Sequence, residues 1–270
     1  MTLLDLCETM QFDHEMINNV LEIDSTYNHD EISPMWQKLY NNTTWDEGIK
    51  QLQAYFGEDT YGMKILTCIL HCTLYTYELY RKKGIPHPIF VDTVKFIPRF
   101  LERHKQTHGF YAFVWAWWFP RQLSLHEFRI GALEYELKYE GDMPQIYIHI
   151  PSDANFKKDS LSTSYNELKE FLIKYYPDFV TAEWYCDSWL LSPALKQLLP
   201  SDSNILHFQN SFEVIRVEEE STAFLEWIYL RKDLPYDKLP EVTSLQRTVK
   251  AHLLNGGNIG WTLGKFKGNC

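Results

Sequence analysis

Hydrophobic residues recur at helical spacing through the first half of the chain. Residues 14–27 carry one apolar side, and residues 63–83 repeat the pattern over a longer stretch that Gly84 ends. A further helix is predicted across residues 89–107. The apolar run 110–119 fits a buried helix or a buried strand, because periodicity does not separate the two. The first half is therefore expected to be almost entirely helical.

Strand-like alternation begins after Pro120. Apolar and polar residues alternate imperfectly in residues 128–139 and regularly in residues 145–151. A Glu-Gly-Asp turn lies between the two runs, so together they predict an antiparallel hairpin. A strand is expected again at residues 181–191.

A polar loop and a helix separate this hairpin from the strand at 181–191. The loop covers residues 152–163, and Ser164 with Glu167 has the spacing of a capping box for a helix ending near Tyr176. A strand that opens into a loop and then a helix leaves free backbone N–H groups at the end of the sheet, where small anions are commonly held. This arrangement is the first candidate site.

The remaining pattern completes an α+β fold. It predicts a short helix at 192–199, strands at 212–217, 224–230 and 259–266, and a helix opened by Thr243 and Gln246. Helices that alternate with strands, after a nearly all-helical first half, predict two domains. We expect an N-terminal all-α domain at 1–122 and, at 123–270, a mixed β-sheet domain flanked by helices.

Charge and composition narrow the function. Hydrophobic residues make up 45% of the chain, which is ample for a core, and aromatic residues make up 16%, typical of filled cores and lined pockets. The net charge of −10 argues against a general nucleic-acid binder, which needs a basic surface to displace counterions. An anionic ligand therefore requires a local basic patch.

No membrane or targeting segment is expected. The longest apolar run, 110–119, is too short to span a bilayer, and residues 1–10 have no basic start of the secretory kind. The five scattered cysteines are odd in number, which is typical of reduced thiols and predicts a cytoplasmic location.

Several short motifs resemble an uncharacterised bacterial acyltransferase family. They are HIPS at 149–152, CDSWLL at 186–191, SNI at 203–205, FQ at 208–209, TSLQR at 243–247, AHL at 251–253 and GG at 256–257. Members of that family look like an N-terminal helical domain followed by a GNAT-like C-terminal domain, the type found in acyl-CoA-dependent N-acyltransferases. The likeness covers most of the chain and is densest from residue 125 onward.

The resemblance implies a site for an acyl-CoA co-substrate. The strands at 145–151 and 181–191 would be the fourth and fifth of a GNAT sheet, which splay apart and admit the pantetheine arm between them. The pyrophosphate would sit on the loop before the helix, and an amine would attack the thioester directly, with a backbone N–H stabilising the oxyanion. The implied cofactor contacts are Ile150, Ser152, Asn155, Lys157, Lys158 and Ser160.

Two departures from the GNAT pattern affect this site. The loop at 152–160 contains no glycine, which GNAT enzymes use to wrap the pyrophosphate, and Lys157 and Lys158 supply charge instead. The helix at 192–199 lacks the usual tyrosine that protonates the departing thiolate. Tyr185, Ser188 or a water would have to serve.

Two further residues are candidates for catalysis. His149 alternates with Ile148 and Ile150, so it faces the opposite side from them, where it could act as a general base or as a structural histidine. Glu134 shares a strand face with Glu136, and the pair could hold a substrate ammonium or simply form a solvated face.

Three functions stay open at this point. The first is N-acyl transfer from acyl-CoA to a small-molecule amine or acyl acceptor, and the second is a catalytically inactive GNAT-like binding module. The third is a carbohydrate-active protein, which needs two carboxyl groups about 5–10 Å apart across a cleft. No metal site is predicted, because Cys68, His71 and Cys72 lie in an apolar helix and the pair His104 and His108 lacks a His-Glu-x-x-His sequence. The sequence does not predict the oligomeric state.

Overall fold

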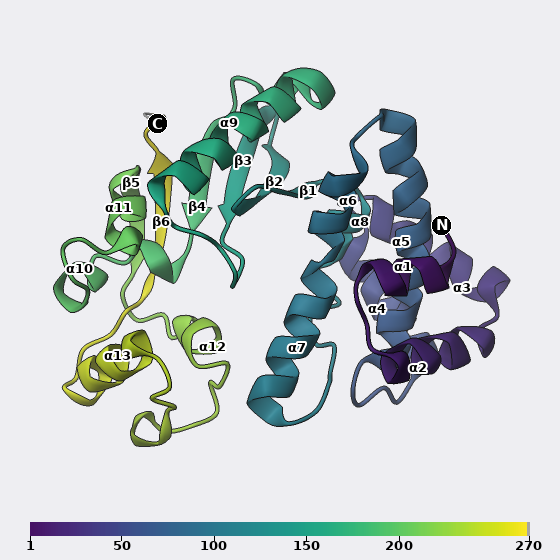
Figure 1. Ribbon diagram of the computed structural model, residues 1–270, viewed down its shortest axis with the longest axis horizontal. Helices are drawn as coiled ribbons and strands as arrows, with labels where there is room; N and C mark the ends of the chain where they lie inside the picture. Colours follow the sequence, from purple (N-terminus) through teal and green to yellow (C-terminus); the bar gives the residue numbers. More distant parts are fainter. Residues whose placement is uncertain (269–270) are drawn as a thin grey trace. The chain divides into compact units, whose positions relative to one another are not determined.

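A computed structural model describes residues 1–268 of the chain (Figure 1). The backbone divides into two compact units, one covering residues 1–129 and the other starting at Ile130. The family resemblance and the sequence pattern placed the boundary slightly earlier, at residues 122–123.

The N-terminal unit is built from helices. They are α1 (Leu3–Thr9), α2 (His14–Ser25), α3 (His29–Trp36), η1 (Gln37–Tyr40), α4 (Trp45–Phe56), α5 (Met63–Lys83), α6 (His87–Val94), α7 (Phe96–His108) and α8 (Pro120–Leu123). Helix α5 is the centre of this unit, because it packs against α1, α2, α3, α4, α6 and α8. Its side chains Leu66, Ile69 and Leu70 are fully buried, as the apolar periodicity predicts.

Two predictions for this unit are wrong in detail. The helix expected at 89–107 is broken at Lys95 into α6 and α7, and Pro98 lies in the first turn of α7, where its missing N–H removes no helical hydrogen bond. The apolar run 110–119 forms neither a helix nor a strand. Its backbone is instead anchored by a hydrogen bond from the Phe113 N–H to the Tyr61 carbonyl oxygen (2.8 Å).

The C-terminal unit is organised around a mixed sheet. The strands are β1 (Glu127–Ile130), which spans the boundary between the units, β2 (Leu133–Glu140), β3 (Met143–His149), β4 (Glu183–Asp187), β5 (Phe212–Glu218) and β6 (Trp261–Phe266). Their order in the sheet is β1-β2-β3-β4-β6-β5. The β3–β4 pair is parallel, and the β2–β3, β4–β6 and β5–β6 pairs are antiparallel, so the sheet is mixed as predicted.

Helices connect and cover these strands. They are α9 (Lys158–Tyr175), η2 (Pro177–Phe179), η3 (Trp189–Leu191), α10 (Leu195–Leu198), α11 (Asn204–Asn210), α12 (Phe224–Ile228), η4 (Tyr236–Lys238) and α13 (Ser244–Leu254). Figure 1 shows α9 crossing one face of the sheet. The Tyr165 ring of α9 lies 5.9 Å from the Trp184 ring and 4.9 Å from the Phe266 ring, so the helix covers the apolar face of β4 and β6.

Ser164 does not cap a helix. Helix α9 begins seven residues earlier than a Ser164 cap allows, and Ser164 is fully buried within it. The Ser164 hydroxyl donates to the Ile130 carbonyl oxygen and is hydrogen-bonded to the Tyr135 hydroxyl (2.7 Å). Gly131, with φ +61°, turns the chain against this point, where a Cβ would lie 3.0 Å from the Ser164 Cβ. The predicted strand 128–139 is therefore two strands, β1 and β2.

The segment 224–230 is also not a strand. It contains helix α12, whose side chains Phe224, Leu225 and Ile228 are buried with Tyr229. These side chains join a hydrophobic cluster with residues of η3, α10 and α13. Their spacing is that of one helix face, which the aromatic and β-branched composition concealed. The capping box of Thr243 and Gln246 at the start of α13 is confirmed.

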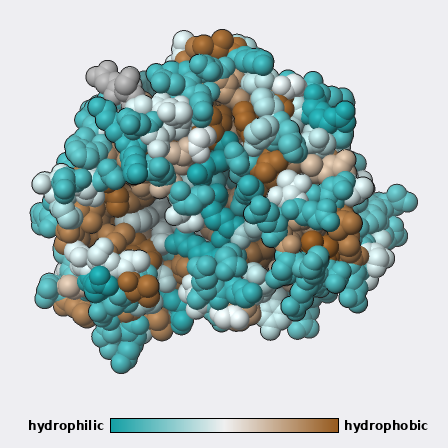
Figure 2. Space-filling view, viewed as in Figure 1, coloured by the Kyte–Doolittle hydropathy of each residue, from teal (hydrophilic) through white to brown (hydrophobic). Residues whose placement is uncertain are grey.

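The surface alternates between polar and apolar areas. On the face seen in Figure 2, hydrophilic residues surround separate hydrophobic patches. Among residues 1–268, every helix is too short or too polar to traverse a bilayer. Cys7, Cys68, Cys72 and Cys186 are free and buried, and Cys270 lies outside the described residues.

Candidate active site

Strands β3 and β4, at the middle of the sheet, are paired over only part of their length. They pair over three rungs, Gln145 with Glu183, Ile146 with Trp184 and Tyr147 with Tyr185. Strand β3 continues to His149 and β4 to Asp187, but within the described chain the pairing between them ends at Tyr147 and Tyr185. From Tyr185 onward β4 pairs on its other side with β6. The edges of β3 and β4 that face each other are thus left open at their carboxyl ends.

One face of the sheet carries the polar candidates. Residues that are register partners project from the same face, so Glu134 and Glu136 of β2 share a face with their partners His149 and Tyr147 of β3. Tyr147 is in turn the partner of Tyr185. The opposite face holds Tyr135, Leu137, Ile146, Ile148 and Trp184, all of them buried.

His149 is held by a carboxylate on this polar face. Its Nε2 lies 2.9 Å from an Oε2 oxygen of Glu136, and the two side chains are 22% and 10% exposed. The direct register partner of His149 is Glu134, which is also buried, so the hydrogen bond to Glu136 runs diagonally across the strands. A carboxylate that accepts from one ring nitrogen fixes the imidazole tautomer and stabilises the imidazolium, which is the arrangement a general base needs.

Tyr185 and Ser188 lie near the point where the strands part. The Tyr185 hydroxyl donates to the Glu183 carboxylate, and this hydrogen bond raises the pKa of Tyr185 to about 12. The Tyr185 ring stacks on the Tyr147 ring at 5.5 Å. Ser188 is buried, and its Oγ accepts from the Leu190 N–H at the start of η3 (3.2 Å). Both hydroxyls thus have structural partners, and that of Tyr185 holds its proton tightly.

The loop between β3 and α9 carries the predicted cofactor contacts. Ser152, Asn155, Lys157 and Lys158 are exposed, and the Asn155 side chain accepts from the Lys157 N–H (3.0 Å). Such an Asx turn shapes the loop without glycine. At the base of the loop, Ile150 packs against the hydrophobic cluster that contains Trp189 and Leu190, as does Phe156.

The first turn of α9 lacks an internal acceptor. Lys157 precedes the helix without a side-chain cap, and within the described chain no acceptor is found for the N–H groups of Lys158, Asp159 and Ser160. Unpaired N–H groups and the positive end of a helix dipole are the features that favour an anion at a helix N-terminus. Lys157 and Lys158 add positive charge there, whereas Asp159 is the acidic residue of the first turn.

Sequence reasoning found part of this site. Strand alternation predicts that His149 lies on the polar face and that Glu136 shares that face with Glu134. It does not predict the hydrogen bond between Glu136 and His149, because a diagonal contact depends on side-chain rotamers. Sequence reasoning did not select Glu183, the partner of Tyr185, although residues 183, 185 and 187 alternate on the polar face. That alternation was the available signal.

Family models match nearly the whole chain. A model described as N-acyltransferase N-terminal domain matches residues 1–125, and one described as GNAT-like C-terminal domain matches residues 127–266. The chain therefore belongs to the family of N-acyltransferases with a GNAT-like C-terminal domain. The resemblance to an acyltransferase family with a GNAT-like C-terminal domain is confirmed.

Solved structures share this fold. One is an acyltransferase in complex with decanoyl-CoA and teicoplanin, 19% identical, with a TM-score of 0.78 over 97% of this chain and 86% of that chain. Another is an acyltransferase in complex with decanoyl-CoA, 20% identical, with a TM-score of 0.77 over the same shares. No curated protein matches the chain.

Proposed function

We propose that the chain transfers an acyl group from acyl-CoA to an amine of a small-molecule acceptor. The observation that carries this proposal is the parting of β3 and β4 after Tyr147 and Tyr185. The open strand edges offer backbone N–H and C=O groups to an extended pantetheine arm, which would pair with them as an added strand does. Two of the similar acyltransferase structures hold decanoyl-CoA, and a third holds CoA. One of the decanoyl-CoA complexes also holds teicoplanin and the CoA complex holds 10C-Teicoplanin, which supports this class of donor and a small-molecule acceptor.

The terminus of α9 would hold the coenzyme diphosphate. The N–H groups of Lys158, Asp159 and Ser160 point out of the helix, and Lys157 and Lys158 are exposed beside them. Ser152 and Asn155 lie in the same loop, and Ile150 begins it at the end of β3. A glycine-free loop can serve here because the Asx turn at Asn155 already bends the backbone.

The polar face would carry the chemistry. When His149 Nε2–H donates to Glu136, Nδ1 is the basic nitrogen of the ring. The acceptor nitrogen attacks the thioester carbonyl carbon, its proton passes to the imidazole, and the Glu136 carboxylate stabilises the resulting imidazolium. The C–N bond forms as the C–S bond breaks, and the coenzyme thiolate takes a proton from water, either directly or relayed through the Ser188 hydroxyl, which water reprotonates. Glu134, beside this pair, would attract the ammonium form of the acceptor.

Calorimetric titration of the full chain tests donor binding. We expect saturable binding of acetyl-CoA, decanoyl-CoA and free CoA, and the absence of binding at millimolar ligand would overturn the proposal. Lys158→Ala removes a charge, while Lys158→Pro removes the charge and one N–H at the first helical position, where proline is tolerated. Lys157 already has the extended backbone that a following proline requires. Weaker binding in Lys158→Pro than in Lys158→Ala isolates the backbone contribution, and Lys169→Ala, exposed further along α9, is the matched control.

The same titration distinguishes the enzyme from a second candidate function, that of a catalytically inactive binding module. The absence of glycine from the loop favours an inactive GNAT-like module that keeps the fold without the coenzyme. Such a module would bind none of the three ligands. Acyl-CoA thioesters and the four buried free cysteines both fit a cytoplasmic site of action, which we include in the proposal.

A further inference from the structure

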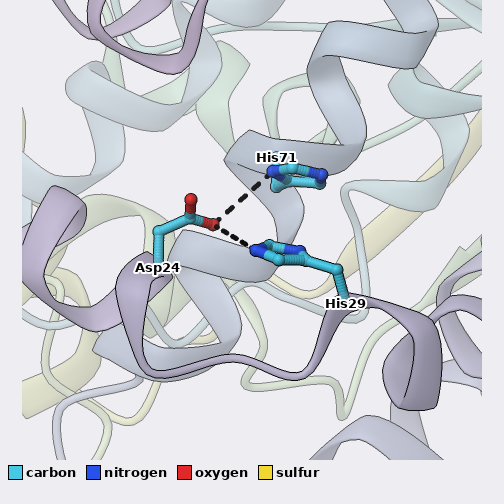
Figure 3. Close-up of side chains that lie close together, drawn as sticks. All are labelled: Asp24, His29 and His71. Atoms are coloured by element: carbon cyan, nitrogen blue, oxygen red, sulfur yellow. Dashed lines mark ion pairs between the residues drawn. The ribbon is translucent and has the colours of Figure 1, made fainter.

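A second group of ligating side chains lies in the N-terminal unit. Asp24 is near the end of α2, His29 is the first residue of α3, and His71 lies in the middle of α5. Figure 3 shows the two imidazoles and the carboxylate converging from three different helical segments. One ligand atom from each lies within 4.8 Å of the other two.

The distances within this group are too long for hydrogen bonds. The Asp24 Oδ1 oxygen lies 3.7 Å from His29 Nε2 and 3.5 Å from His71 Nδ1. Asp24 Oδ1 and His71 Nδ1 are both buried from solvent, and neither has a hydrogen-bond partner within the described chain. Buried polar atoms are rarely left without a partner, so this convergence calls for an occupant.

The spacing suits a small cation. A tetrahedral Zn²⁺ holds nitrogen and oxygen ligands at about 2.0–2.2 Å, which places neighbouring ligand atoms roughly 3.3–3.6 Å apart. The two separations from Asp24 are 3.7 and 3.5 Å, and all three separations lie within 4.8 Å. Binding therefore requires the ligand atoms to move closer and the stacked rings of His29 and His71 to turn toward a common point. Two imidazoles and one carboxylate are a donor set that zinc accepts readily.

We propose that Asp24, His29 and His71 bind one Zn²⁺ ion that joins α2, α3 and α5. Three protein ligands leave a fourth coordination position for water. The side chains of Asp24, His29 and His71 are 22%, 39% and 34% exposed, so the ion and a water reach the site from solvent. Bound zinc would stabilise the folded N-terminal unit, because it binds ligand atoms that only folding brings together.

The chain contains a matched control pair of histidines. His104 and His108 of α7 stack at 4.3 Å, the same ring separation as His29 and His71. They do not belong to any three-ligand group found among residues 1–268. Stacked imidazoles are therefore present at both places, but among residues 1–268 a three-ligand group is found only around His29 and His71.

Calorimetry of the chelator-treated full chain with zinc chloride tests the site. We expect the parent protein to bind one equivalent of zinc. Loss of an outer-shell partner typically lowers metal affinity by roughly 10–100-fold, so Asp24→Asn and His71→Ala, which remove ligands, should each lower it by at least that much. The double variant His104→Ala/His108→Ala should bind as the parent does. Absence of saturable binding, binding unchanged in both site variants, or binding lost in the control variant would each overturn the proposal.

Cobalt provides a readout that does not depend on how well the variants fold. Co²⁺ in the parent protein should give the intense visible absorption of tetrahedral coordination, and added zinc should remove it. A spectrum of hexa-aqua cobalt in the parent protein would contradict the site.

Discussion

The two units each bring imidazole and carboxylate together, at different distances. On the sheet of the C-terminal unit, one imidazole, that of His149, lies 2.9 Å from the Glu136 carboxylate. In the helical unit, two imidazoles surround one carboxylate at 3.5 and 3.7 Å without a hydrogen bond. The same residue types therefore form a hydrogen-bonded pair on the sheet, Glu136 with His149, which we call the directional pair. In the helical unit Asp24, His29 and His71 form a wider group, which we call the open cage.

The difference comes from the elements that carry the residues. Antiparallel strands place diagonal side chains within reach, and the register of β2 and β3 fixes the pair of Glu136 and His149. Separate helical segments are held apart by their packed side chains, and the Asp24 and His71 groups lie 3.5 Å apart, beyond hydrogen-bond distance. A short contact suits proton transfer, whereas the wider spacing leaves room for a cation between the ligand atoms.

Removing the imidazole of the directional pair should have the largest effect. In His149→Ala, kcat is expected to fall by about 10²–10⁴-fold, the usual contribution of a general base, while the affinity for acyl-CoA stays unchanged. Release of the coenzyme thiol from decanoyl-CoA in the presence of an amine measures this. His207→Ala, exposed on α11, is the control. An unchanged kcat in His149→Ala would make His149 a structural residue.

Removing only the charge of its partner should have a smaller effect. Glu136→Gln keeps an acceptor for His149 but loses the charge-assisted part of a hydrogen bond, a class that contributes about 1.5–3 kcal/mol. We expect kcat to fall by roughly tenfold, since 1.4 kcal/mol corresponds to one factor of ten. The same thiol assay applies. If Glu136→Gln and Glu134→Gln lower kcat equally, the diagonal pair has no special role.

Tyr185 and Glu183 form a third contact with a carboxylate, a hydrogen bond that can be compared with the directional pair and the open cage. Its hydroxyl proton is held by Glu183, and the pKa of about 12 makes it a poor proton donor near neutral pH. Tyr185→Phe should therefore lower kcat by much less than the roughly 10²-fold that loss of a general acid costs. A larger fall would assign the proton transfer to Tyr185 and not to Ser188 or water.

The smallest effect is expected in the open cage when no metal is present. Asp24 makes no hydrogen bond to either ring, and ion pairs that are partly exposed contribute about 0–1 kcal/mol. In the presence of a chelator, Asp24→Asn should change the free energy of unfolding by less than about 1 kcal/mol, measured by urea denaturation. With zinc added, the parent protein should gain stability and the variant should not. A large loss without metal would show that the charge itself holds α2 and α5 together.

The sequence predicts the elements whose periodicity or capping is local. The alternation of Ile146 and Ile148 located β3, and Thr243 with Gln246 located the start of α13. It failed where tertiary packing decides. Ser164 has the sequence of a cap but is buried at the Tyr135 hydroxyl.

The candidate sites divide in the same way. The polar face with His149 follows from alternation alone, whereas its hydrogen bond to Glu136 requires the packed side chains. The cage of Asp24, His29 and His71 has no sequence signal, because His71 comes from a helix far along the chain and was grouped there with Cys68 and Cys72. Convergence of this kind is visible only once the helices are packed.

Strand β4 pairs first with β3 and then, from Tyr185 onward, with β6, and this has a consequence for how well the fold tolerates mutation. A donor arm that pairs with open strand edges is read by main-chain atoms, which every amino acid supplies. Under the proposed function, extensive sequence change can leave this contact intact, because it depends on the backbone and not on side-chain identity. Attempts to change the donor preference should accordingly begin with Tyr147 and Tyr185, whose stacked side chains lie where the pairing of β3 and β4 ends.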